Sequence, residues 1–375
     1  MKVIHYIKFI SLALLLSITV SASCQEDTAV STEAVTTEVK TNEVEAAEVK
    51  SEKFNPAPMI MEHIADAHEF HIAGHLHIPL PCILYNRAEG KLDVFSSSKL
   101  EEGYNGYKYS EETEEDKIKH IEREDKAAFL DFSITKNVFS MMVGATLLLL
   151  IFFSVAGSYK TRKNQAPKGL QSLIEPLVVF VRDDIAKPGL GKHYEKFLPY
   201  LMTAFFFILI NNLLGLIPIF PGGANVTGNI AVTLVLALFT GILINVNGTK
   251  DYWKHIFTPP VPIPLYILMV PVEVIGVITK PVTLMIRLFA NITAGHIIVL
   301  SLVSLIFVFG NYNEATDVVG SPAGAGLGSV VAVLFTLFIS VIELLVAFIQ
   351  AFIFTMLSSV FLGMALEEHE HAEHH

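Results

Sequence analysis

Long stretches without a charged residue constrain this chain more than any other feature of its sequence. Between Lys196 and Lys250 there are 53 consecutive residues with no Asp, Glu, Lys or Arg, and residues 137–159 form another such stretch of 23. A helix needs about 20 apolar residues to cross the hydrocarbon core of a bilayer. Only 17% of the residues are charged, against roughly 25% in soluble proteins. The sequence therefore excludes a purely soluble protein.

We predict an all-α polytopic membrane domain over residues 132–368, with about five spanning helices. The last predicted span has 37 residues, which makes about 55 Å of α-helix against a hydrocarbon thickness of about 30 Å. Ordinary tilts of roughly 20° cannot absorb this excess, so the last two spans must break or form a long, steeply tilted helix hairpin around a polar turn at residues 311–325. The predicted spans are residues 137–159, 198–218, 228–247, 265–310 and 326–362.

Charged residues between the spans predict the orientation of the chain. Basic residues gather at 160–168 and at 250–255, and the positive-inside rule places both segments in the cytoplasm. Residues 170–196 mix apolar and charged positions, as an amphipathic helix on the cytoplasmic surface does. The His-rich tail, residues 369–375, is then also cytoplasmic.

The N-terminal third differs in composition from the rest. Residues 24–130 hold 23 acidic and 11 basic residues, a net charge of −12, whereas the rest of the chain holds 14 acidic and 15 basic residues, a net charge of +1. Residues 1–23 are typical of a signal peptide, because lysines precede a 12-residue apolar run and small residues follow it. An uncleaved signal anchor and a lipidated Cys24 are the alternatives. Residues 24–58 are predicted to be a disordered, acidic, exported linker, since they contain no aromatic residue before Phe54.

Residues 59–131 are predicted to form a small extracytoplasmic region. The segments 78–85 and 91–98 have the pattern of short strands, and the charged segment 111–131 has that of a helix. Three of the histidines in this region would share one face of a helix, and imidazole suits zinc or copper. With only two cysteines in the chain, we nevertheless expect no metal site and no disulfide framework. The histidines are His63, His68, His71, His75 and His77.

Five polar side chains lie inside the two hairpin helices, where one charged residue costs about 3 kcal/mol or more. Such residues are functional by default, and a buried structural ion pair between an Arg and a Glu is the alternative. The five are Arg287, Asn291, His296, Glu343 and Gln350.

The spacing of the polar residues assigns them to faces of a helix. Thr279, Thr283, Arg287 and Asn291 recur at steps of four and therefore line one face. His296 lies nine residues beyond Arg287, which places it on the opposite face.

Antiparallel packing of the hairpin sets the depth of each group. The midpoint of residues 296 and 343 is 319.5 and that of residues 287 and 350 is 318.5, both inside the predicted turn. We therefore expect His296 at the depth of Glu343, and Arg287 at the depth of Gln350. His and Glu exchange protons near neutral pH, whereas a guanidinium stays charged, so the hairpin carries the groups that a proton path needs.

Four segments of the membrane domain are distinctive. They are KPVTLMIRLFANITAGH (280–296), ELLVAFIQAFIF (343–354), FILINNLLGLIP (207–218) and NVTGNIAVT (225–233). Together they resemble subunit a of the rotary (F-type) ATP synthase membrane sector, over about residues 135–368. An Arg followed by Leu, Phe and then Asn at i+4 in a membrane helix is rarely found by chance. The N-terminal extension lies outside the common family core, so the resemblance says nothing of its role.

The resemblance implies roles for individual residues. Arg287 would face the ring of c subunits, and His296, Glu343 and Asn291 would line the inlet half-channel. Gln350 falls on a further family position for proton translocation. Many bacterial members carry the carboxylate on the first of the two helices and the His on the second; here the two are exchanged, which preserves the pair. Near the cytoplasmic end, Glu273 and Lys280 fall on family positions, and the candidates for a cytoplasmic half-channel are Glu273, Thr279 and Thr283.

The resemblance further implies the stator half of a proton-driven rotary motor in the bacterial inner membrane, with two offset half-channels that pass protons to and from the c-ring. Its partners would be the c-subunit ring, the b subunits of the peripheral stalk, the remaining ATP synthase subunits and membrane lipid. We expect no cofactor and no catalysis by the chain itself, which has no GxxxxGK[ST] loop for ATP chemistry. Nucleic acid is not an expected partner, because no basic stripe could follow its phosphates. A secondary transporter and a metal-uptake membrane protein are the alternative functions.

Overall fold

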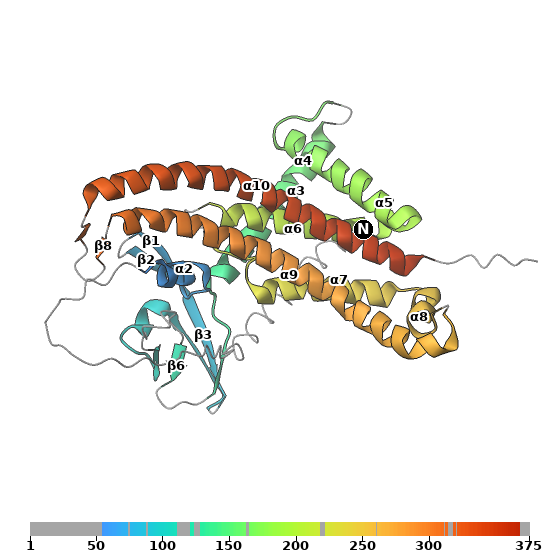
Figure 1. Ribbon diagram of the computed structural model, residues 1–375, viewed down its shortest axis with the longest axis horizontal. Coiled ribbons are helices and arrows are strands. Elements are labelled where there is room, and N and C mark those ends of the chain that lie inside the picture. Colours follow the sequence, from blue (N-terminus) through green and yellow to red (C-terminus); the bar gives the residue numbers. More distant parts are fainter. Residues whose placement is uncertain are drawn as a thin grey trace, which may run out of the picture.

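A computed structural model gives the arrangement of the chain (Figure 1). It contains a bundle of long helices, here called the membrane domain (residues 136–366), and a smaller part packed beside it, here called the cap (residues 55–135). The predicted signal peptide, residues 24–54 of the predicted linker and the His-rich tail lie outside the described residues. The structure describes residues 55–73, 76–87, 89–110, 121–123, 128–162, 165–217, 222–259, 261–310, 312–313, 318–319 and 321–367.

Five helical stretches in the described residues are long and apolar enough to span a membrane, which confirms the predicted number. The spans predicted at 198–218 and 228–247 correspond to α6 and α7. In chain order the elements are α3 (Lys136–Thr161), α4 (Leu170–Phe180), the π-helical turn η3 (Val181–Ala186), α5 (Lys187–Leu190), the 3-10 turn η4 (Gly191–His193), α6 (Tyr194–Gly215), α7 (Ile230–Asn247), α8 (Lys250–Phe257), α9 (Ile263–Phe309), β8 (Tyr312–Asn313), β9 (Val318–Val319) and α10 (Pro322–Leu366).

Polar side chains fix where three of these helices begin. Thr135, Asn229 and Ser321 each accept, through a side-chain oxygen, a hydrogen bond from a backbone N–H in the first turn of α3, α7 and α10 respectively. Such N-caps satisfy donors that the helix itself leaves unpaired. Unpaired backbone groups are especially costly near hydrocarbon, so each cap helps to set the depth at which its helix starts.

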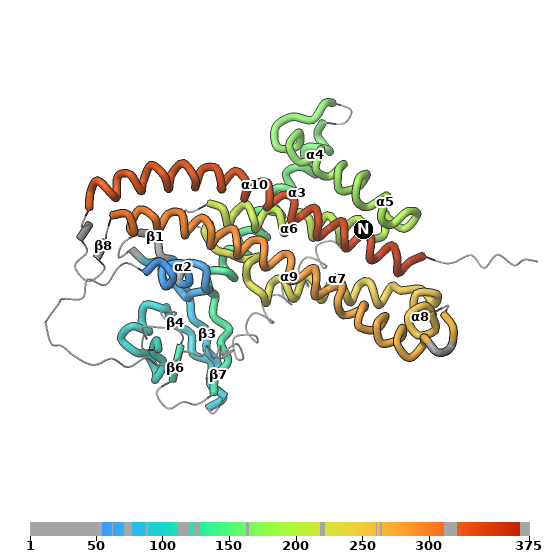
Figure 2. The backbone as a smooth tube through the Cα atoms, in the orientation of Figure 1, coloured from blue at the N-terminus to red at the C-terminus, as the bar shows by residue number. Residues whose placement is uncertain are grey.

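The last two helices form the expected long hairpin. α9 and α10 contain 47 and 45 residues and run side by side along the bundle (Figure 2). α9 continues through Pro271 and Pro281, so the hairpin does not break. At about 1.5 Å per residue each helix is roughly 70 Å long, more than twice a hydrocarbon core of about 30 Å. Both helices must therefore lie steeply tilted in a bilayer.

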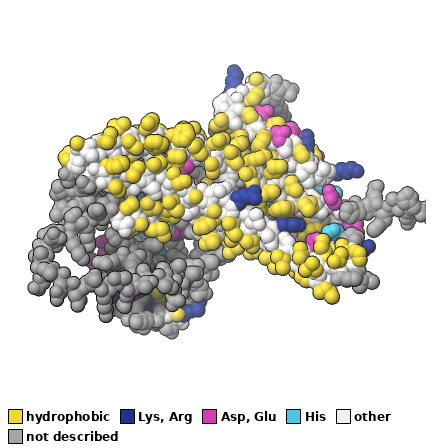
Figure 3. Space-filling model, viewed as in Figure 1, with side chains coloured by type: hydrophobic (Ala, Val, Ile, Leu, Met, Phe, Trp, Pro, Cys, Tyr) yellow, Lys and Arg dark blue, Asp and Glu magenta, His cyan; other side chains and the backbone are white. Residues whose placement is uncertain are grey.

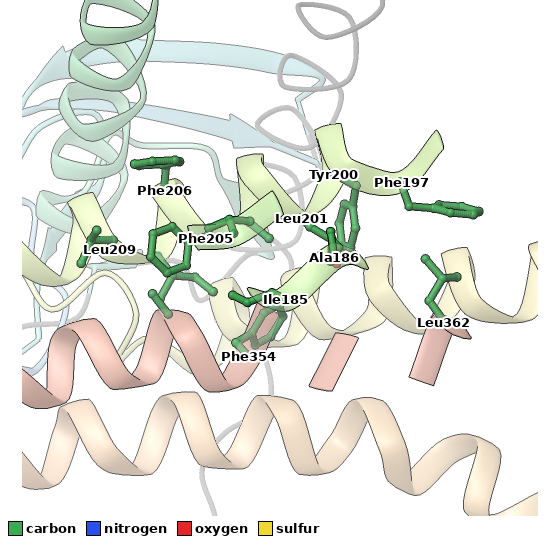
Figure 4. Packing of buried hydrophobic residues seen from close by; sticks show 14 of the residues in the cluster. Ile185, Ala186, Phe197, Tyr200, Leu201, Phe205, Phe206, Leu209, Phe354 and Leu362 are labelled. Atoms are coloured by element: carbon green, nitrogen blue, oxygen red, sulfur yellow. The ribbon is translucent and has the colours of Figure 1, made fainter. Parts of the chain in front are cut away.

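The apolar core of the bundle surrounds α6. Phe205 and Ile208 of α6 are fully buried, and Phe354 of α10 and Ile185 of η3 belong to the same cluster (Figure 4). The Phe205 and Phe348 rings meet edge to face, with centroids 5.9 Å apart. Lipid tails are as apolar as these side chains, so close packing rather than water exclusion selects the arrangement within the membrane.

The predicted amphipathic segment is a run of short helical pieces over residues 170–193. Val181 and Ile185 are buried on its inner side, where η3 packs against α6 and α10. On its outer side Asp183 forms ion pairs with Arg182 at 2.7 Å and with Lys187 at 2.6 Å. The segment thus has the two contrasting faces that its sequence predicted.

Strands predominate in the cap. β3 lies between β4 and β7 in an antiparallel three-stranded sheet. Cys82 and Leu84 of β3 and Phe95 of β4 are buried on one side of this sheet. The predicted strand 78–85 is divided between β2 and β3, which belong to different sheets, and the predicted strand 91–98 ends at Ser96, where a 3-10 turn begins. The elements of the cap are α2 (Pro56–Ile64), β1 (Glu69–Ala73), β2 (Leu76–Pro79), β3 (Pro81–Asn86), β4 (Lys91–Ser96), the 3-10 turn η2 (Ser97–Leu100), β5 (Tyr107–Tyr109), β6 (Ile121–Arg123) and β7 (Phe129–Asp131).

The helix predicted over residues 111–131 is wrong where the structure describes this segment. Ile121–Arg123 form β6, which pairs with β5, and Phe129–Asp131 form β7, which pairs with β3. Pairing with strands distant in the sequence overrides the local helix preference of a segment rich in Glu and Lys.

The cap histidines do not gather on a helix face, because His71 lies in strand β1. His68 is buried and its Nε2 lies 3.0 Å from a carboxylate oxygen of Asp131. Within the described ranges no group of three or more His, Cys, Asp and Glu side chains is placed to hold a metal ion.

Hydrogen bonds and apolar contacts attach the cap to the membrane domain. The Asp66 carboxylate accepts hydrogen bonds from the Thr135 hydroxyl at 2.8 Å and from the Asn137 backbone N–H at 3.1 Å. A buried cluster joins Phe70 of β1 to Met141 of α3 and to the start of α7. In addition α2 packs against α9. The cap therefore lies where α3 and α7 begin and α6 ends, which we call the cap end of the membrane domain.

Candidate functional site

The polar stripe of α9 lies where neighbouring helices leave this helix partly uncovered. Thr279, Thr283 and Asn291 are exposed in the isolated chain and Arg287 is half-buried, whereas Leu288 is fully buried in the core. No carboxylate in the described part of the chain forms an ion pair with the Arg287 guanidinium. A guanidinium inside a bilayer is costly without a counter-charge, so its place on the uncovered side favours a carboxylate from another chain.

Asn291 links this stripe to α10. Its side-chain amide donates a hydrogen bond of 2.7 Å to Oε1 of Gln350, a buried side chain. Nε2 of Gln350 is buried without a partner among the described residues, so both of its N–H groups remain available as donors. Sequence reasoning placed Arg287 at this depth, one helical turn before Asn291, so the register derived from the sequence is correct to within a turn.

His296 and Glu343 lie at the same depth but point in different directions. A methyl group added to Gly295 would lie 2.5 Å from Oε1 of Glu343, so this carboxylate packs against the backbone of α9 beside His296. Nε2 of His296 instead lies close to Gly215, at the end of α6, 3.7 Å from where a methyl group on that glycine would be. No ion pair joins the two side chains within the described residues. The depths agree with the sequence-derived register, and a direct contact is not formed.

A buried polar cluster at the cap end of α6 was not identified as a site from the sequence. The Thr227 hydroxyl donates a hydrogen bond of 2.5 Å to Oδ1 of Asn212, and the Asn212 amide donates to the Ala347 carbonyl of α10 at 3.3 Å. Oδ1 of Asn211 and the side-chain amide of Asn225 are buried without a partner in the described ranges. The sequence signal that could have identified this cluster is the pair of consecutive asparagines, Asn211 and Asn212, in an uncharged span, because polar groups in a spanning helix are costly.

The end of the polar stripe that points away from the cap carries two charged residues. Glu273 and Lys280 are two helical turns apart on α9, and both are half-buried. Nζ of Lys280 lies 5.8 Å from the ring centroid of Tyr252 in α8 and 5.7 Å from that of Phe361 in α10. Aromatic faces attract an ammonium at such distances, so Lys280 is held where three helices meet.

Apolar side chains surround the stripe on the outer surface of α9 and α10 (Figure 3). Ile278 and Ile286 of α9, and Val341 and Leu345 of α10, are each more than half exposed. A large exposed apolar face inside a bilayer suits lipid or an apolar helix of a partner. The hairpin can therefore hold one fixed positive charge, flanked by polar and titratable side chains, against a partner within the membrane.

Two family models match the chain. One, described as ATP synthase A chain, matches residues 138–363, which form the membrane domain. The other, described as a domain of unknown function (DUF8433), matches residues 59–138, which form the cap. The boundary between the two matches falls at the start of α3.

Bacterial proteins named ATP synthase subunit a are similar to this chain. The one from Chloroherpeton thalassium is 45% identical over 262 residues, which cover 68% of this chain and 73% of the relative. The one from Pelodictyon phaeoclathratiforme is 46% identical over 261 residues, or 68% of this chain and 72% of the relative. A relative from an Anaeromyxobacter species is 40% identical over 255 residues, or 66% of this chain and 57% of the relative.

Proposed function

This chain belongs to the ATP synthase A chain family, and from this premise we propose how its residues conduct protons. Membership of this family makes the chain a multi-pass membrane protein and a proton-channel subunit of ATP synthase that is not catalytic on its own. Family membership rules out the two alternative functions considered from the sequence, a secondary transporter and a metal-uptake protein. The proposal itself is that two offset half-channels pass protons to and from a ring of c subunits.

The inlet half-channel is proposed to open at the cap end. His296 and Glu343 lie at one depth on the two hairpin helices, so they can take up a proton in succession through intervening water. Deeper in the membrane, the amides of Asn291 and Gln350 lead toward the face that the ring would occupy. The hydrogen-bonded pair Asn212 and Thr227 adds polar lining at the same end.

Arg287 is proposed to separate the two half-channels. A guanidinium does not give up its proton in proteins, so Arg287 cannot carry the transported proton. Its positive charge instead favours the ionised form of an approaching ring carboxylate. A deprotonated carboxylate can leave Arg287 only after it receives a proton, which gives the rotation a direction set by the proton gradient.

The outlet half-channel is proposed to run along the other end of the stripe. Thr279 and Thr283 are exposed on the uncovered face of α9, and Glu273 lies one to two turns further toward the start of the helix. The two hydroxyl groups share one face of the helix, since they are four residues apart, and together with the carboxylate nearer the start of α9 they can hold a chain of water molecules toward the cytoplasm.

The exposed apolar face of α9 and α10 is the surface proposed to contact the c-ring. Other apolar surfaces, such as α3 with its exposed Leu150 and Phe153, are proposed to face lipid or the b subunits of the peripheral stalk. The remaining subunits of the synthase complete the assembly.

The cap is proposed to lie outside the cytoplasm, in the periplasm of a bacterial cell. The basic residues Lys160 and Arg162 end α3 at the side opposite the cap, as the positive-inside rule requires. A Val94→Cys variant, in a Cys24→Ser background, places one exposed thiol on the cap. An impermeant maleimide should label it in intact spheroplasts; labelling only after lysis contradicts this orientation.

The observation that carries the proposal is the half-buried Arg287, without an ion-pair partner in the described chain, on a face left uncovered. Arg287→Ala should abolish proton-driven ATP synthesis in proteoliposomes while the complex still assembles. Arg287→Lys should restore little, because an ammonium in the membrane can lose its proton and leak. Arg182→Ala removes an arginine from an outer ion pair and should leave the rate near wild type. A correctly assembled Arg287→Ala complex that makes ATP at the wild-type rate contradicts the proposal.

A further inference from the structure

Surface segments hold the end of α10 that lies away from the cap (Figure 1). The Phe180 ring of α4 packs on the Phe352 ring of α10, with centroids 5.6 Å apart. At the start of α8, the Thr249 backbone N–H donates a hydrogen bond of 2.9 Å to the carbonyl of Ala365, in the last turn of α10. The last carbonyls of a helix have no partner within it, so this hydrogen bond stabilises the end of α10.

Ser359 forms the contact between α10 and the π-helical turn η3. Its hydroxyl donates a hydrogen bond of 3.1 Å to the Ile185 carbonyl, and both residues are buried. The hydroxyl of Thr355, one turn earlier on α10, instead donates to the Ala351 carbonyl of the same helix. Turns of π-helix occur frequently at functional sites. The Ser359 hydroxyl therefore joins two elements, whereas that of Thr355 serves α10 alone.

Two glycines let the backbones of α5 and α10 touch beside this hydrogen bond. A methyl group on Gly189 of α5 would overlap Oγ of Ser359, and a methyl group on Gly363 of α10 would overlap the Gly189 carbonyl oxygen. The residues on either side of Gly363 are Leu362 and Met364, so neither could take its place at this contact. The contact therefore prevents α10 from sliding along its axis or turning about it.

We propose that this contact, here called the α10 joint (Ile185, Gly189, Ser359 and Gly363), keeps the hairpin in place while the c-ring turns. The inference rests on the function proposed above. The hairpin lies steeply tilted, and its exposed apolar face is the surface proposed to contact the ring. A ring that turns in the membrane plane then pushes on the hairpin largely along the axis of α9 and α10. The joint opposes this movement, and its members are positioning residues that do not touch the transported proton.

The helix α10 connects the joint to Arg287. Gln350 lies nine residues before Ser359, roughly 13.5 Å along the helix. Its Oε1 accepts the hydrogen bond of 2.7 Å from Asn291, one turn beyond Arg287. A shift of α10 at the joint would therefore displace Gln350 and Glu343 relative to Arg287. A ring carboxylate would then pass Arg287 without exchanging its proton, and ATP hydrolysis would continue without proton transport.

The test measures ATP-driven proton pumping and ATP hydrolysis together, in proteoliposomes that contain the complete ATP synthase. An opposing membrane potential, imposed with potassium and valinomycin and kept below the value that stalls wild type, raises the force on the hairpin. Ser359→Ala should pump near the wild-type rate without a potential. At a high opposing potential the number of protons that it pumps per ATP should fall several-fold, whereas wild type should keep its ratio. Gly363→Ala should show the same dependence on the potential.

Each variant has a matched control on α10. Thr355→Val removes a buried hydroxyl that bonds only within the helix, one turn from Ser359. Gly326→Ala adds the same methyl group as Gly363→Ala at a position where no other atom lies within 4 Å. Both controls should keep the wild-type ratio of protons to ATP at every potential.

A disulfide across the joint tests whether the contact stays closed during rotation. A methyl group on Gly189 would lie 3.0 Å from Cβ of Ser359, near the roughly 3.8 Å between the Cβ atoms of a disulfide. In a Cys24→Ser background, the oxidised variant with Gly189→Cys and Ser359→Cys should pump like wild type at every potential. After reduction it should lose coupling at high potential, because the Ser359 hydroxyl is absent.

Three results would overturn this inference. A wild-type dependence of Ser359→Ala on the potential means that other contacts hold α10. Loss by the same factor at every potential means that the substitution only lowers the amount of correctly packed protein. Arrest of pumping by the disulfide means that α10 has to move at the joint. Arg287→Ala, measured without a potential, tests the proposed function separately: pumping at the wild-type rate removes the motor itself, whereas an inactive Arg287→Ala beside an unaffected Ser359→Ala removes only the role of the joint.

Discussion

Asn291 and Gln350 are joined by a side-chain hydrogen bond of 2.7 Å that crosses from α9 to α10 in the middle of an apolar helix pair. The two residues are 59 positions apart in the chain, so the bond fixes the register of the hairpin. It also places both amides next to the turn of α9 that carries Arg287. The hydrogen bond thus serves the geometry of the stripe as well as the stability of the hairpin.

A double-mutant cycle with Asn291→Ala and Gln350→Ala should reveal coupling between these residues. Hydrogen bonds between membrane helices contribute about 0.6 kcal/mol on average, and at most about 1.7 kcal/mol in measured cycles. We therefore expect each single variant to slow ATP-driven proton pumping, and the double variant to be less impaired than the two effects multiplied. Strictly multiplicative effects on the pumping rate mean that the two amides act independently.

Thr227→Val should destabilise the cap end of the membrane domain. The Thr227 hydroxyl is buried and donates to Oδ1 of Asn212, which the valine would leave without this donor. A buried acceptor that loses its partner costs about 1–3 kcal/mol. Thr146→Val is the control, because its hydroxyl bonds to its own helix on an exposed face of α3. Denaturant unfolding in detergent should separate the two variants; equal midpoints contradict a structural role for the Asn212 hydrogen bond.

The sequence predicted the helices of the membrane domain better than the contacts between their polar groups. Uncharged stretches and helical spacing placed all five spans and the register of the hairpin to within one turn. The same reasoning could not predict that the His296 ring turns toward Gly215 and away from Glu343. Spacing gives the depth and face of a residue, whereas side-chain direction depends on the space left by α6, which is far away in the sequence.

The Cys82 thiol should resist alkylation in the folded protein. Burial, together with the negative charge of Asp131, raises the pKa of Cys82 to about 12, and the side chain is fully buried. The thiolate is the reactive form, and at about pH 8 only about one thiol in ten thousand is ionised at such a pKa. In a Cys24→Ser background, maleimide should label Cys82 only after denaturation. Val94→Cys on the exposed side of the sheet should be labelled at once, and equal labelling of both thiols in the folded state contradicts the packing of the cap.

The attachment of the cap could not have been predicted from local sequence. Alternating apolar residues predicted the strands at 78–85 and 91–98, since period-two patterns report a half-buried sheet. Asp66, however, accepts a hydrogen bond from Thr135, a residue 69 positions away. No local pattern distinguishes an Asp that will meet the start of a distant helix from one on an ordinary polar surface. Contacts of this kind attach the cap to the start of α3.

Gly295→Ala should impair proton uptake by displacing Glu343. The added methyl group would lie 2.5 Å from Oε1 of Glu343, closer than side-chain atoms pack. Ala favours helix over Gly by about 1 kcal/mol, so α9 itself should not be weakened. The carboxylate must therefore move away from its place beside His296, and proton pumping into inverted vesicles should slow several-fold.

Gly276→Ala is the matched control for this prediction, because it adds the same methyl group to the same helix. No other atom lies within 4 Å of the position that its methyl group would take. The Gly276→Ala variant should pump protons at the wild-type rate. A Gly295→Ala complex that assembles fully and pumps as fast as this control means that the position of the Glu343 carboxylate does not limit proton entry. Slowing in both variants instead means that α9 tolerates no added methyl group, so the effect at Gly295 would not report on Glu343.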